Sequence, residues 1–288
     1  MLARLLAVAG FCWTCAAADQ VMNCSTDPGI STWAVYVRAM TPKLTMASSL
    51  QASDFILKVD GAEQKPCGYS HLQLPVSIGM VLDTSASMAE HKAAMRAGVE
   101  KFLSASSPQD QYFLTDVNSP KAVPVGFAND ISRIRAGIAF APRGGTALID
   151  SLYVAAQEMQ KARHPTRALI VFSDGDDNQS VYKPNHLIQA LAATPVPIFL
   201  LVPITAQLPM QEVPELTRMQ LPGGLTARFS DARQTEGVVT EIAAAIREPY
   251  IFYFNRPTGA APPRSLHVAL RHGAPKANLY YFAQPEKR

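Results

Sequence analysis

The stretch Pro75-Val-Ser-Ile-Gly-Met-Val-Leu-Asp-Thr-Ser-Ala-Ser87 decides how the rest of the chain is interpreted. Its apolar run has the length and the side chains of a buried strand, and a helical pattern follows it. Between strand and helix stand one carboxylate and two hydroxyls, those of Asp83, Ser85 and Ser87. Such oxygens suit a hard divalent cation such as Mg²⁺. The same residue types also cap helices, so this stretch alone leaves a metal site and a plain cap both open.

The composition is that of a globular chain with a full core. Its 288 residues are 48% hydrophobic, which allows one large domain of about 200 residues and a smaller one. The formal net charge of +3 is small, and no dense block of lysine and arginine occurs. We therefore expect no nucleic-acid partner.

The first eighteen residues have the pattern of a secretory signal. A short basic start, Met1–Arg4, precedes the apolar run Leu5–Cys15, and Ala16–Ala18 offers a small-residue cleavage site. We predict a cut after Ala18 and a secreted or periplasmic mature chain. The apolar run is too short to span a bilayer comfortably, with a retained anchor as the alternative. No comparable run follows, so we expect no transmembrane segment in the mature chain.

Removal of the signal leaves two cysteines, Cys24 and Cys67. Two cysteines in an exported chain predict one disulfide, because exported proteins fold in oxidising surroundings. We therefore expect a Cys24–Cys67 bridge, with two free thiols as the alternative.

Between residues 74 and 248 the sequence alternates between strand and helical patterns. This alternation predicts an α/β fold: a doubly wound, mostly parallel sheet with helices on both faces. The expected strands cover residues 76–82, 111–117, 122–127, 167–173, 196–203 and 227–229, and the expected helices cover residues 89–103, 131–140, 147–161, 184–193 and 235–247.

The flanking segments, residues 19–73 and 249–288, are rich in strand patterns instead. We expect the two to pair into one small β unit beside the α/β domain, with two independent β segments as the alternative. Alternation over Trp33–Met40 predicts a half-buried strand. Residues 19–29 show little pattern and are predicted to be a tail, whereas residues 61–73 are predicted to be a polar linker. Further strands are expected over residues 55–59, 250–255, 265–270 and 277–282.

Three loops of the α/β region carry hard oxygen donors. The first holds Asp83 and its two serines, the second is Gly144-Gly145-Thr146, and the third is Ser173-Asp174-Gly175-Asp176-Asp177-Asn178. The carboxyl ends of parallel strands meet at one edge of a sheet, so Asp83 and Asp174 can converge there despite their distance in sequence.

The order Asp-x-Ser-x-Ser, Gly-Gly-Thr and Ser-Asp-Gly resembles the von Willebrand factor A domain with its metal-ion-dependent adhesion site. More narrowly, it resembles the bacterial exported family of VWFA-related domain proteins, common in Acidobacteria. The shared stretches are Ser53–Gly61, Pro75–Gly79, Gly144–Asp150, Ser173–Asn178 and an aromatic β tail, so the likeness spans Trp33 to Phe282.

The resemblance implies a Rossmann-like fold and a set of metal ligands. The Ser85 and Ser87 hydroxyls would coordinate the cation directly. The Asp83 and Asp174 carboxylates would bind it, often through water molecules. Thr146 would coordinate it directly or through water, depending on the state of the site. The expected cation is Mg²⁺, with Mn²⁺ or Ca²⁺ as alternatives. A protein partner would complete the site with an Asp or Glu carboxylate.

Competing interpretations have less support in the sequence. The stretch from Asp174 to Asn178 lacks the later glycine and glutamate of an EF-hand loop. No nucleophile elbow surrounds Ser85 and no phosphate-binding loop occurs, so we expect neither an enzyme nor a nucleotide-binding protein. Two alternatives stay open: a metal that only stabilises the loops, and a metal-assisted hydrolase.

Overall fold

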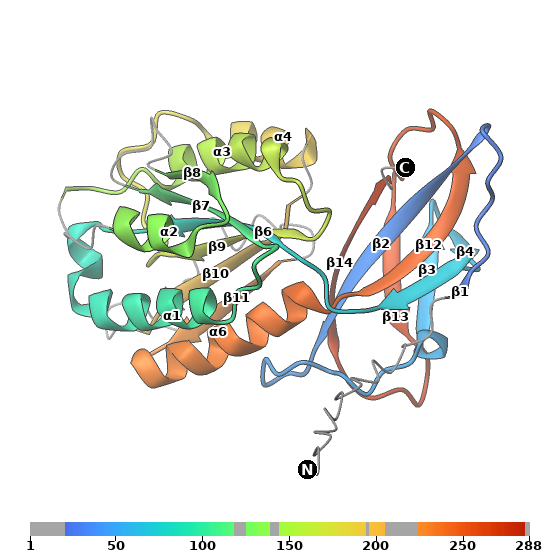
Figure 1. Cartoon of the computed structure of the whole chain (residues 1–288), viewed down its shortest axis with the longest axis horizontal. Helices are drawn as coiled ribbons and strands as arrows, with labels where there is room; N and C mark the ends of the chain where they lie inside the picture. Colours follow the sequence, from blue (N-terminus) through green and yellow to red (C-terminus); the bar gives the residue numbers. More distant parts are fainter. Residues whose placement is uncertain (1–20, 118–124, 139–143, 194–195, 205–223, 286–288) are drawn as a thin grey trace, which may run out of the picture.

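The computed structural model describes residues 21–117, 125–138, 144–193, 196–204 and 224–285. The predicted signal segment, residues 1–18, lies outside the described residues, as do the start of the strand expected at 122–127 and the end of the helix expected at 131–140. The described elements form two units side by side, one of α/β type and one of β type (Figure 1).

A six-stranded sheet with the order β11-β10-β9-β6-β7-β8 forms the centre of the α/β unit. All neighbouring strands are parallel except β8, which runs antiparallel to β7. The fold-class prediction is therefore confirmed. The strands are β6 (Ser77–Leu82), β7 (Gln111–Asp116), β8 (Val125–Ala128), β9 (Arg167–Phe172), β10 (Ile198–Pro203) and β11 (Leu225–Phe229).

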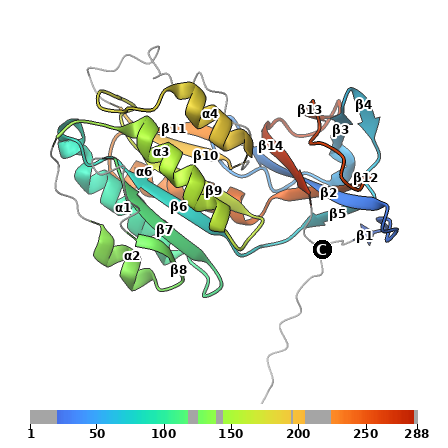
Figure 2. The ribbon, with the colours of Figure 1, turned by 90° about the horizontal axis from the view of Figure 1, so that it is seen from above.

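Helices cover both faces of this sheet (Figure 2). Alternate residues of β6 show why its sequence is apolar throughout: Met80 packs in the core with α1 and α6, and Val81 packs in the core with α3 and α4. Parallel strands covered on both faces are apolar on both faces. The helices are α1 (Lys92–Ser104), α2 (Ile131–Gly137), α3 (Leu148–Glu158), α4 (Pro184–Ala193) and α6 (Ala232–Arg247), with 3₁₀ turns at Ala86–His91 and Met159–Lys161. Among the described helices, none combines the length and the apolar character that crossing a membrane requires.

The β unit consists of two antiparallel sheets, with the orders β1-β5-β12-β2-β14 and β13-β3-β4. Strands β12 and β14 flank β2, and β13 pairs with β3, so the two terminal segments form one unit as predicted. The strands are β1 (Val21–Met22), β2 (Ile30–Met40), β3 (Phe55–Val59), β4 (Ala62–Gln64), β5 (Gly68–His71), β12 (Tyr250–Pro257), β13 (Leu266–Leu270) and β14 (Asn278–Pro285). A 3₁₀ turn, Ala52–Asp54, precedes β3.

The prediction of a half-buried strand over Trp33–Met40 is wrong, because β2 is buried on both faces from Trp33 onward. Val35 and Val37 pack in the core between the two β sheets. Tyr36 and Arg38 point the other way and are buried too, and the Arg38 guanidinium lies over the Phe199 ring of β10. The α/β unit therefore covers the face that the sequence pattern assigned to solvent.

The predicted tail and linker also contain strands. Strand β1 pairs with β5, and the Asn23 backbone N–H donates to the Cys67 carbonyl at 2.7 Å. These strands are only two to four residues long, so no alternating pattern marks them in the sequence. Pairing with neighbouring strands, rather than local preference, determines them.

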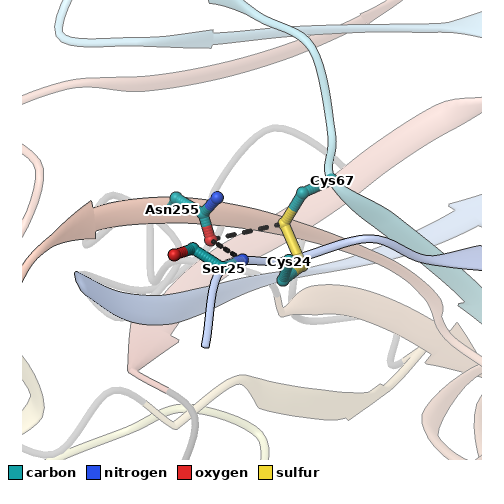
Figure 3. Close-up of a disulfide and its surroundings, with 4 residues drawn as sticks. All are labelled: Cys24, Ser25, Cys67 and Asn255. Atoms are coloured by element: carbon teal, nitrogen blue, oxygen red, sulfur yellow. Dashed lines mark hydrogen bonds between the residues drawn. A yellow bond between two sulfur atoms is a disulfide. The ribbon is translucent and has the colours of Figure 1, made fainter. Parts of the chain in front are cut away.

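The Cys24–Cys67 disulfide joins these same two segments, which confirms its prediction (Figure 3). Asn255 of β12 lies beside it: its Oδ1 accepts from the Ser25 backbone N–H at 3.2 Å and is 3.6 Å from the Cys67 sulfur. A disulfide sulfur carries no proton, so the second approach is a contact and not a hydrogen bond. The bridge thus anchors the start of the described chain to β5 and β12.

Candidate metal centre

The candidate site lies where β6 and β9 end. The two strands are parallel neighbours with Leu82 opposite Phe172, so the residues that follow them, Asp83 and Ser173, stand side by side. The Ser173 hydroxyl donates to Asp83 Oδ2 at 2.6 Å, and the Asp83 backbone N–H donates to the Phe172 carbonyl at 2.9 Å. The first and third predicted loops therefore meet at one sheet edge.

The first loop presents two hydroxyls next to each other. Asp83 Oδ1 accepts from the Ser85 backbone N–H at 2.9 Å, which folds the loop back on its carboxylate. Ser85 occupies the N-cap of the 3₁₀ turn, yet its side chain makes no capping hydrogen bond. Its Oγ lies instead 3.0 Å from the Oγ of Ser87, and Ser87 is exposed whereas Ser85 is buried. The plain-cap interpretation of these serines does not explain this arrangement.

The second loop closes against the third. Gly144 has a φ of +71°, and a Cβ on Gly145 would lie 2.5 Å from Asn178 Oδ1, so both positions need glycine. Thr146 is buried; its N–H donates to Asn178 Oδ1 at 2.9 Å, and its carbonyl accepts from the N–H of Asn178 at 3.0 Å and of Gln179 at 2.9 Å. These exchanged bonds hold Thr146 beside the third loop.

The third loop places Asp174 in a buried position two residues after the end of β9. Its Oδ1 accepts from the Asp176 backbone N–H at 3.1 Å, and the Gly175 N–H donates to the Ser173 hydroxyl at 3.0 Å. Asp176 and Asp177, the two acids that follow, are exposed.

The electrostatics of the site disfavour two negatively charged carboxylates without a cation between them. Burial raises the pKa of Asp83, hydrogen bonds from Ser173 and Ser85 oppose this, and the nearby charge of Asp174 raises it further. Burial and the charge of Asp174 also raise the pKa of Asp176. A divalent cation would relieve this repulsion, and the donor set of two carboxylates and three hydroxyls consists of the hard oxygens that Mg²⁺ prefers. Within the described residues, no cluster of three or more His, Cys, Asp or Glu side chains offers a competing metal site.

Several supporting residues were missed in the sequence. The Thr84 hydroxyl donates to both carboxylate oxygens of Asp116, at 2.7 and 2.9 Å, and so joins the first loop to β7. Asp150 of α3 accepts from the N–H groups of Val181 (3.1 Å) and Tyr182 (2.8 Å), which pins the end of the third loop. Asp150 lies two residues after Leu148 and therefore opposite the apolar side of the helical pattern, where an acid is unremarkable.

Comparison with known proteins finds one family that resembles part of the α/β unit. Residues 78–176 match the family model for the von Willebrand factor type A domain. This segment, about a third of the chain, is similar to that domain. The matched segment contains all five predicted ligands, Asp83, Ser85, Ser87, Thr146 and Asp174.

Solved structures support the same fold. A von Willebrand factor type A protein from Catenulispora acidiphila superposes with a TM-score of 0.50 at 11% identity, covering 90% of this chain and 74% of that one. Proximal thread matrix protein 1 from the mussel byssus gives a TM-score of 0.50 at 15% identity, covering 66% of this chain. The match spans 50% of the mussel protein's length. No curated protein matches the chain in sequence.

Proposed function

We propose that this chain is an exported, non-enzymatic binding module that uses a divalent cation, Mg²⁺ in the first place, to capture a carboxylate of a protein partner. The observation that supports this most strongly is the convergence of three loops on one sheet edge, with two buried carboxylates and a pair of adjacent serine hydroxyls. Ligands bind at this edge in open α/β sheets.

The hydrogen bonds suggest how the residues would share the cation. Both oxygens of Asp83 already accept, from Ser173 and from the Ser85 N–H, which favours contact through water for this carboxylate. The Ser85 hydroxyl makes no capping hydrogen bond, and it and the neighbouring Ser87 hydroxyl would bind directly. A cation with few direct carboxylates stays electron-poor, and it would therefore attract an Asp or Glu side chain of the partner.

Export is supported by the Cys24–Cys67 bridge, which fits an extracellular protein. The proposed secretory signal over residues 1–18, with a cut after Ala18, would direct the chain there. N-terminal sequencing of the mature protein from its native host tests this part. An intact residue 1 on the exported protein would refute cleavage.

Calorimetry tests the metal. Titration of Mg²⁺ into wild-type protein should release binding heat that Asp83→Ala abolishes. Asp177→Ala is the matched control, because it removes an exposed carboxylate from the third loop and should keep the heat. Equal heats for wild type and Asp83→Ala would refute a metal site at this edge.

Partner capture tests the bridging role. Immobilised protein should retain its partner in Mg²⁺ and release it in EDTA, and Asp83→Ala should capture nothing in either buffer. Capture that EDTA does not affect would contradict metal bridging.

A structural metal is the second candidate function. It is favoured by the direct hydrogen bonds that already join the loops, such as Ser173 to Asp83 and Thr146 to Asn178, because a cation there would reinforce an existing frame. In that case EDTA would lower the melting temperature and leave partner capture unchanged.

A further inference from the structure

A buried arginine stands at the junction between the two units. Arg38 lies on β2, whose flanking strand β14 is on the side of the β unit that faces the α/β unit (Figures 1 and 2). Its side chain is among the largest buried ones, and the residue is only 1% exposed. The guanidinium carbon lies 5.7 Å from the ring centre of Phe199 in β10 and 5.4 Å from that of Phe282 in β14.

This guanidinium has no polar partner. None of its three nitrogens makes a hydrogen bond, and none of the ion pairs among the described residues includes Arg38. Burial lowers the pKa of Arg38 to about 10, so the side chain still carries its charge at neutral pH. A second arginine, Arg167 of β9, also interacts with Tyr36: its Nε has no hydrogen-bond partner, its Nη2 donates to Gln284 Oε1 at 3.3 Å, and burial lowers its pKa as well.

The two aromatic rings do not balance this charge. A cation over a ring recovers part of the hydration that burial removes, but a buried charge ordinarily requires a charged partner. Tyr36, whose electrostatic influence raises the pKa of both arginines, is a neutral hydroxyl at physiological pH. A water molecule could accept hydrogen bonds here, yet it would leave the charge uncompensated. The chemistry of the junction therefore calls for an anion.

We propose that the junction binds a small monovalent anion, for example chloride, against the Arg38 guanidinium. Tyr36, Phe199 and Phe282 around Arg38 are all buried, which favours a small anion over a larger one. Phe199 is the second residue of β10, so this site lies toward the amino end of the sheet, opposite the metal edge. The anion site is independent of the proposed metal function, and it would make the contact between the two units depend on chloride.

Thermal unfolding tests the proposal. The melting temperature of the full chain is measured in EDTA while chloride replaces gluconate at constant ionic strength. Wild type should gain stability with chloride and then saturate. A tenfold shift of the folding equilibrium would raise its melting temperature by about 3 to 6 °C. Arg38→Met should show no chloride response, because it removes the charge and keeps an apolar chain of similar length.

Arg271→Met is the matched control. It removes the same charge from an exposed arginine that pairs with Glu63, so it should respond to chloride as wild type does. Equal chloride responses in wild type and Arg38→Met, or none in wild type, would overturn the proposal.

A crystal of the wild-type chain grown in bromide gives a second readout that does not depend on the folding of any variant. We expect one anomalous peak within hydrogen-bonding distance of the Arg38 guanidinium. An interpretable map without that peak would overturn the proposal.

Discussion

Replacing Asp110 with asparagine should destabilise the whole α/β unit. The Arg247 guanidinium at the end of α6 donates to Asp110 Oδ2 at 2.6 Å, and their side chains are 6% and 0% exposed. The same carboxylate accepts from the backbone N–H groups of Val76 (2.9 Å) and Ser107 (2.7 Å). Asp110 therefore joins the last helix to the chain that enters β6 and to the turn before β7.

The magnitude follows from burial. Asp110→Asn keeps an oxygen for a backbone donor and removes the charge that balances Arg247. Breaking one side of a buried ion pair costs about 3 to 5 kcal/mol. At the lower value, and with a shift of about 2 to 4 °C per kcal/mol, the melting temperature should fall by about 6 to 12 °C. Adding Arg247→Met should recover part of the loss, since no unpaired charge then remains.

Urea unfolding followed by circular dichroism measures the free-energy costs, and thermal unfolding measures the fall in melting temperature. The control is Glu100→Gln, which removes the acid of a half-exposed pair with Arg135 and should cost at most about 1 kcal/mol. If Asp110→Asn costs no more than Glu100→Gln, the reasoning from burial is refuted.

Three further predictions concern other parts of the chain. Reducing the Cys24–Cys67 bridge, which closes a separation of 43 residues, should cost about 4 kcal/mol in urea unfolding; an unchanged midpoint would contradict this. Gly79→Ala should cost about 1 to 3 kcal/mol, because its Cβ would lie 2.2 Å from a phenylalanine ring of β7, whereas Gly237→Ala in α6 meets nothing and should be neutral or stabilising. Hydrogen bonds from a backbone N–H and an arginine lower the pKa of Asp60. The Asp60 carboxylate therefore stabilises the folded chain above its unfolded pKa, and this stabilisation is lost as the pH falls through the lower folded pKa. Asp60→Asn should make the free energy of unfolding fall less steeply at acid pH; an unchanged fall would count against this reasoning.

Most of the α/β unit could be predicted from sequence because its elements are marked locally. Strands such as β6 and β9 are continuous apolar runs, since helices cover both faces of a parallel sheet. Helix α4 matches its predicted bounds, residues 184–193. Elsewhere the ends differ by a few residues; the helix expected from residue 89, for example, begins as a 3₁₀ turn and becomes α-helical at Lys92.

The β unit was harder to predict because its structure depends on distant contacts. Strands β1, β4 and β5 are short and exist through pairing. The outer face of β2 has the tyrosine and arginine of an exposed face, and only the packing of the α/β unit reveals that Tyr36 and Arg38 are buried.

The candidate site likewise has residues that the sequence predicts and residues that only the structure reveals. Asp83, Ser85, Ser87, Thr146 and Asp174 stand out in the sequence because each belongs to a recognisable loop motif, and the structure brings those loops together. Ser173 and Asn178 act by holding other residues in place. Their roles depend on hydrogen bonds across loops, which no spacing in the sequence encodes.

The most direct test of the central claim is the anomalous map of a crystal grown with Mn²⁺ in place of Mg²⁺. We predict a single strong peak in bonding contact with the hydroxyls of Ser85 and Ser87, and no peak there for the Asp83→Ala variant. A map without that peak, or with manganese held only by the exposed carboxylates of Asp176 and Asp177, would contradict the proposed metal-dependent binding module.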